Sequence, residues 1–145
     1  MNAAVVPLSC WQDPQGDLVL IYSERECSVF FGCWVRSGEP ADYVGRLSFE
    51  RAAAVRSYGR EFIPYQLPAS GVHSYILRVS DSDFLREQVA YRLQHYPQFA
   101  GPPMQHFVVV GHDIYHEVLA ASFTEATIPA ADLTDERLLV LHRSA

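Results

Sequence analysis

A succession of short apolar segments separated by turn-forming residues constrains the fold most. Leu18–Tyr22 and Cys27–Arg36 are two such segments, and the residues between them, Ser23–Glu26, are polar. β-Branched and aromatic residues favour strands, and a short polar connection is typical of a hairpin. We therefore expect the two segments to pair as antiparallel strands. Gly32, inside the second segment (CSVFFGCWVR), predicts a bulge or the close approach of another backbone.

Further segments extend this pattern. Apolar alternation or β-branched composition predicts strands at Tyr43–Phe49, His73–Val79, Gln105–Val110 and Leu138–His142. Residues 1–11 have no clear pattern and are expected to be a lead-in, and Ser37–Asp42 is expected to be a loop.

One helix is predicted over residues 81–95. Ser80 is followed three positions later by Asp83, which is typical of a helix start. Apolar residues then recur at helical spacing, and Pro97 ends the segment; these residues are Phe84, Leu85, Val89, Leu93 and Tyr96. The expected fold is α+β: a single domain over 1–145, with an antiparallel sheet of six or seven strands packed against this helix.

Two segments remain ambiguous at this level. Residues 50–58 contain three consecutive alanines, which favour a helix, but their length also suits a strand. Residues 112–123 have apolar residues at helical spacing, whereas Gly111-His112-Asp113 is typical of a tight turn after a strand. A turn would continue an antiparallel sheet, so we favour a hairpin for this segment.

Composition argues against several classes of function. The eleven basic residues are all Arg, so the chain has no lysine for Schiff-base chemistry or a phosphate-binding P-loop. The net charge of −6 and the scattered arginines argue against nucleic-acid binding. Neither a signal peptide nor a membrane-spanning segment is expected, which predicts a cytoplasmic protein whose cysteines, Cys10, Cys27 and Cys33, are free thiols.

The sequence GHDIYHE contains the one pattern that suggests chemistry. His112, Asp113 and His116 form an H-D-x-x-H motif, which resembles the H-E-x-x-H motif of zinc proteases with Asp in place of Glu. On a helix the two histidines could share one zinc ion, with Asp113 as the base. On a strand they would be too far apart. With no recognisable third ligand, the expected alternative is that His112 lies in an exposed turn and His116 faces solvent or pairs with a carboxylate.

Two hypotheses about function follow. The first is a small acidic protein that binds another protein, or a second copy of itself, without catalysis and without a cofactor; neutralising or escorting a partner is one form of this. Two aromatic groups would support it if exposed: Tyr58, Phe62 and Tyr65, and Tyr91, Tyr96 and Phe99. The second is a metal-dependent hydrolase built on the H-D-x-x-H motif at 112–116.

Overall fold

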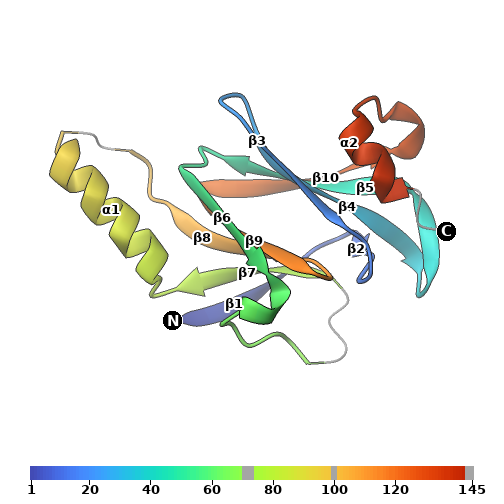
Figure 1. Cartoon of the computed structure of the whole chain (residues 1–145), viewed down its shortest axis with the longest axis horizontal. Coiled ribbons are helices and arrows are strands. Elements are labelled where there is room, and N and C mark those ends of the chain that lie inside the picture. Colours follow the sequence, from blue (N-terminus) through green and yellow to red (C-terminus); the bar gives the residue numbers. More distant parts are fainter. Residues whose placement is uncertain (70–73, 99–100, 143–145) are drawn as a thin grey trace.

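The computed structural model describes residues 1–69, 74–98 and 101–142, and its described part is dominated by two antiparallel sheets (Figure 1). Sheet A has the strand order β1-β7-β8-β9-β6, and sheet B has β10-β5-β4-β2 with β3 also paired to β4. The strands are β1 (Asn2–Pro7), β2 (Trp11–Gln12), β3 (Leu18–Tyr22), β4 (Cys27–Arg36), β5 (Glu39–Glu50), β6 (Ala54–Gly59), β7 (Tyr75–Ser80), β8 (Gln105–Val110), β9 (Ile114–Ala120) and β10 (Ser122–Pro129). The helices are α1 (Asp83–His95) and the one-turn α2 (Glu136–Leu139), with 3-10 turns at Arg60–Phe62, Ala130–Asp132 and Val140–His142.

The main core lies between the two sheets. Sheet B contributes Val29, Phe31, Leu47 and Phe49, and sheet A contributes Ile76, Phe107, Val109, Val118 and Ala120. The outer faces of the sheets carry further apolar clusters. On sheet A, Leu77, Val108 and Tyr115 are covered by Tyr65 and its neighbours. On sheet B, Phe30 and Val44 are covered by Leu138 and Leu141 of the C-terminal segment.

The hairpin expected at residues 18–36 is present with the predicted bounds, and β3 pairs with β4 from Leu18↔Phe31 to Tyr22↔Cys27. Gly32 fulfils both expectations for its position. The β4–β5 register shifts between Gly32 and Trp34, and a Cβ at position 32 would lie 2.8 Å from the carbonyl oxygen of Leu141. The glycine therefore lets the C-terminal segment approach the sheet.

Both ambiguous segments form strands. Residues 54–59 are β6, which pairs with β9 and forms one edge of sheet A. The segment after Gly111 turns back as β9 and pairs with β8, as the favoured hairpin interpretation predicted. The loop expected at Ser37–Asp42 is mostly strand, since Gly38, with φ of 78°, closes a tight turn between β4 and β5.

Several expectations are wrong. The described residues form ten strands in two sheets, and 1–11 contains β1 and the start of β2. β1 is a strand because it pairs along its whole length with β7. Leu138–His142 is helical, and its buried Leu138 and Leu141 cover sheet B instead of joining it. The predicted strand at 73–79 begins at Tyr75 in the structure, and His73 lies outside the described residues.

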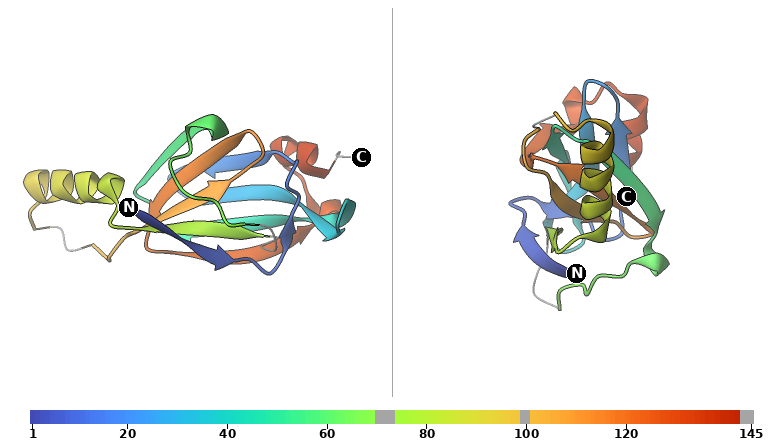
Figure 2. Two further views of the ribbon diagram at one scale, coloured as in Figure 1. Left: turned by 90° about the horizontal axis from the view of Figure 1, so that it is seen from below. Right: turned by 90° about the vertical axis from the view of Figure 1, so that its left-hand side faces the viewer.

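The principal helix differs from the prediction in its packing. It begins at Asp83 and is capped by Ser82, whose hydroxyl accepts a hydrogen bond from the Leu85 amide. It does not lie across a sheet: its first turn contacts sheet A and the rest extends past the end of the sandwich (Figure 2). No helix in the described part of the chain is long and apolar enough to cross a membrane.

Candidate functional site

A buried carboxylate holds the start of α1 against sheet A. Glu117 of β9 is 1% exposed and projects from the outer face of the sheet. One of its oxygens accepts hydrogen bonds from the Tyr65 hydroxyl and from Nε2 of His106, the latter at 2.9 Å. The other oxygen accepts from Nε of Arg56. Three donors on one carboxylate satisfy a charge that burial would otherwise destabilise.

The same network reaches the helix through His106. Nδ1 of His106 lies 2.6 Å from the Ser82 hydroxyl, the group that caps α1. Phe84, the buried residue of α1, packs edge-on against the His106 ring at 5.5 Å between centroids. We call Ser82, His106, Glu117, Arg56 and Tyr65 the anchor network, because together they fix the N-terminus of α1 to the sheet.

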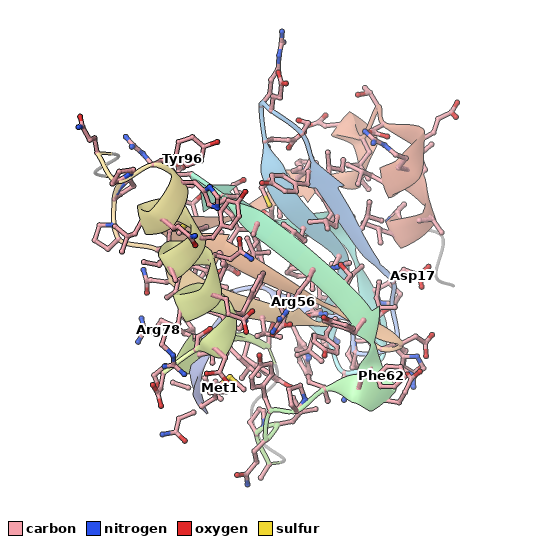
Figure 3. All side chains as sticks on the ribbon, turned by 60° about the vertical axis from the view of Figure 1, so that its left-hand side comes forward. Met1, Asp17, Arg56, Phe62, Arg78 and Tyr96 are labelled. Carbon is pink, nitrogen blue, oxygen red and sulfur yellow. The ribbon has the colours of Figure 1, made fainter. Side chains whose placement is uncertain are left out.

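Arg56 is the member of the anchor network nearest to solvent, with 34% of its side chain exposed. Its guanidinium lies 3.9 Å from the centroid of the Phe84 ring, so it is held by a cation–π contact as well as by Glu117. Figure 3 shows its position between β6 and α1. The anchor network is therefore buried on its inner side, and the Arg56 guanidinium covers its solvent side.

The electrostatics of Glu117 follow from these contacts. Burial opposes ionisation of the carboxyl, but the hydrogen bonds from His106, Arg56 and Tyr65 outweigh it and lower its pKa to about 2. Glu117 is thus charged at neutral pH. Ser82, His106 and Glu117 resemble a nucleophile–base–acid series in residue type, but they are 4%, 0% and 1% exposed, so a substrate of more than a few atoms cannot reach the serine.

Beyond the anchor network, α1 presents a surface that the described residues of the protein leave uncovered. Tyr91, Leu93 and Tyr96 are 58%, 57% and 63% exposed. Beside Tyr91 and Tyr96 is a hollow of about 370 Å³, which we call the α1 groove. Its lining residues come from α1 and from the chain just before β6 and β8: Ala53, Gln88, Tyr91, Arg92, Tyr96 and Met104. Aromatic and methionine side chains beside a hollow are typical of recognition surfaces.

The H-D-x-x-H residues are separated by the turn. His112 and Asp113 are exposed and lie 3.1 Å apart, whereas His116 is buried in β9 and bonds to the Ser57 hydroxyl at 2.6 Å through Nδ1. The helix required for a shared metal is absent, because 114–120 is a strand. Within residues 1–69, 74–98 and 101–142, no three His, Cys, Asp or Glu side chains are grouped to hold a metal ion.

The expectation that His116 faces solvent or a carboxylate is wrong. Val118 and Ala120, two and four residues further along β9, face the core between the sheets, and His116 shares that side. Burial lowers its pKa to about 4, so its ring is neutral. Among the described residues its Nε2 is the buried side-chain polar atom that has no hydrogen-bond partner.

Sequence reasoning missed the anchor network and found part of the α1 surface. Glu117 and His106 lie on different strands, and only the β8–β9 pairing brings them together; His106 alone looks like an isolated strand residue. Tyr91 and Tyr96 were identified as a candidate aromatic surface and are exposed, and Phe99 lies outside the described residues. Of the other aromatic group, Phe62 and Tyr58 are exposed and Tyr65 is buried.

Comparisons of the chain with protein-family models, with curated proteins and with solved structures gave no match.

Proposed function

We propose that this protein binds another protein through the far half of α1 and the α1 groove, and that it does so without catalysis. The observation that carries the proposal is the exposure of Tyr91 and Leu93 on α1 and of Tyr96 at its C-cap, at the end of a helix that projects from the sandwich (Figures 1 and 2). Tyr91 and Tyr96 line the α1 groove, and aromatic side chains beside a hollow are the usual centres of protein interfaces.

The energetics of α1 support the same conclusion. A helix of 13 residues is marginally stable in water by itself, and most helices are stabilised by packing an apolar face. In α1, Phe84 is buried, Leu85, Val89 and Arg92 are half-buried, and the other residues are exposed. Such a helix gains stability if a partner covers its remaining apolar side chains.

The partner we envisage inserts an apolar side chain into the α1 groove between Tyr91 and Tyr96. The chain carries 17 acidic and 11 basic residues, so a basic partner would be attracted at long range. Binding by an acidic, non-catalytic domain is suited to neutralising or escorting such a partner.

A capture experiment with matched surface variants tests this proposal. The test protein is Tyr91→Ser/Tyr96→Ser, and the control is Tyr22→Ser/Val35→Ser, whose target residues are each 48% exposed and lie on β3 and β4. We expect the wild type and the control to retain the same discrete protein from the native cell extract. The α1 variant should bind that protein, once purified, at least about tenfold more weakly, since two interface aromatics together contribute more than 1.4 kcal/mol.

Two other results are informative. If the retained protein is the chain itself, and sedimentation shows a dimer that the α1 variant loses, the partner is a second copy. If all three proteins retain the same partners with the same affinity, α1 is not the binding surface and the proposal is wrong.

A further inference from the structure

A second feature of the molecule that suggests chemistry is a pair of thiols, Cys10 and Cys33, in the core where β2 pairs with β4. β2 pairs with β4 so that Gln12 is opposite Cys33 and Trp11 is opposite Trp34. Cys10 lies two residues before Gln12, so it is on the same side of this pair of strands as Cys33. Both are buried in the core between the sheets, and their side chains are within hydrogen-bonding reach of each other.

The third cysteine is placed differently. Cys27 begins β4 and pairs with Tyr22 of β3, at the opposite end of β4 from β2. Six residues of extended strand separate it from Cys33, which is about 20 Å at ~3.3 Å per residue. A disulfide between these two would exceed the usual Cα separation. Burial and then the charge of Glu26 raise the pKa of the Cys27 thiol to about 11, which makes it unreactive.

Glu125 of β10 holds the Cys10 segment in place. Its carboxylate accepts hydrogen bonds from the backbone amides of Ser9 at 2.9 Å and Cys10 at 2.8 Å. It also accepts a hydrogen bond from the Cys10 thiol at 2.8 Å. The contact with Cys33, burial and this carboxylate all raise the pKa of Cys10, so its thiol is protonated at rest. The same contact lowers the pKa of Cys33, so Cys33 is the thiol that more readily forms a thiolate. The Glu125 carboxylate is hydrogen-bonded to the Cys10 thiol and is therefore placed to accept its proton.

We propose that Cys10 and Cys33 form a redox-active pair, which a hydroperoxide converts into a disulfide that joins the segment before β2 to β4. In the first step the Cys33 sulfur attacks one oxygen of the peroxide, and the O–O bond breaks. This gives a sulfenic acid on Cys33, and the departing oxygen takes the Cys33 proton and leaves as water, or as an alcohol if the oxidant is an alkyl hydroperoxide. In the second step Cys10 passes its proton to Glu125 and its sulfur attacks the Cys33 sulfur. The departing hydroxide takes that proton from Glu125 and leaves as water, and the disulfide remains.

The test is titration of the reduced, folded protein with hydrogen peroxide, followed by intact mass and peptide mapping. We expect the wild type to lose two hydrogens and to yield a peptide cross-linked between Cys10 and Cys33. Trypsin leaves Cys27 and Cys33 on the single peptide Glu26–Arg36, so the Cys27→Ser variant makes the assignment and should cross-link as the wild type does. The oxidised protein should melt several degrees higher than the reduced one.

Two further variants follow the individual steps. In Cys10→Ser the reaction should stop at the sulfenic acid of Cys33, which dimedone traps as an adduct. In Glu125→Gln, checked for folding by circular dichroism, the cross-link should form several-fold more slowly; an unchanged rate would exclude Glu125 as the proton acceptor. The proposal is overturned if folded Cys27→Ser forms no cross-link, whether its thiols stay reduced or are oxidised separately, or if the wild-type cross-link contains Cys27.

Discussion

Glu117 shows how a single buried charge organises the part of the molecule that carries α1. Its carboxylate is the common acceptor for Arg56, Tyr65 and His106, which come from β6, from the segment before β7 and from β8. An acceptor shared by three elements fixes their relative positions, since each donor would be left buried and unpaired if the carboxylate were removed.

The variant Glu117→Gln tests this role. The amide has one acceptor oxygen for three donors, and its own NH₂ group meets a donor. We expect the free energy of unfolding, measured in urea, to fall by about 3 kcal/mol, as it does when one partner of a buried ion pair is removed. The matched control is Glu87→Gln on the exposed side of α1, which should change it by less than ~0.5 kcal/mol. Equal effects of the two variants would show that Glu117 does not hold these three elements together.

His116 predicts a distinct pH dependence. Its pKa is lowered from 6.5 to about 4 by burial, so below pH 6.5 the unfolded chain binds a proton that the folded protein does not. The stabilisation is complete above pH 6.5 and decreases between pH 6.5 and 4, by up to about 3 kcal/mol at 1.36 kcal/mol per pKa unit. Glu117 contributes in a lower window, from about pH 4.5 down to 2.

Urea unfolding at pH 7.0 and 4.5 separates these contributions. The wild type should lose more stability between the two pH values than His116→Gln, which has no ring to titrate. If the two proteins show the same decrease, His116 does not carry this pH dependence.

At the scale of elements, the strands were predictable where local pattern and pairing agree. Leu18–Tyr22 and Cys27–Arg36 have β-forming residues throughout and pair with each other, and their bounds match the prediction. β1 was missed because its residues show no alternation, and it is a strand because β7 supplies hydrogen-bond partners along its length. The prediction of a strand at Leu138–His142 is wrong because a short run of buried apolar residues is compatible with a strand or with a helix. The segment is helical because Leu138 and Leu141 pack against sheet B.

Gly32 gives the sharpest prediction at this scale. A methyl group at position 32 would approach the Leu141 carbonyl oxygen to 2.8 Å, a backbone atom that cannot rotate away. We expect Gly32→Ala to displace the C-terminal segment and lower the free energy of unfolding by about 1–3 kcal/mol, as overpacking does. Hydrogen exchange should show faster exchange around α2. Gly38→Ala is an unsuitable comparison because Gly38 has a positive φ, whereas Ser37→Ala in the same turn is a suitable control.

At the scale of the whole molecule, the α+β class and the antiparallel pairing followed from the sequence, but the division into two sheets did not. The anchor network depends on side chains that lie as much as 61 residues apart in the chain, as Arg56 and Glu117 do. No local signal marks such a pair. Tyr91 and Tyr96 could be named from the sequence as a candidate surface, but the exposure of Leu93 could not be predicted, because helical spacing of apolar residues predicts a packed face.

The body of the protein holds α1 outward, and we propose that a partner covers the end of this helix. Site-specific photo-crosslinking tests this proposal, with p-benzoylphenylalanine replacing Tyr91 in one protein and Tyr22 in the other. Both side chains are exposed, at 58% and 48%. Position 91 should yield a discrete adduct with one protein in the native cell, and position 22 should not. Equal adducts at both positions, or none at position 91, would show that α1 is not the binding surface.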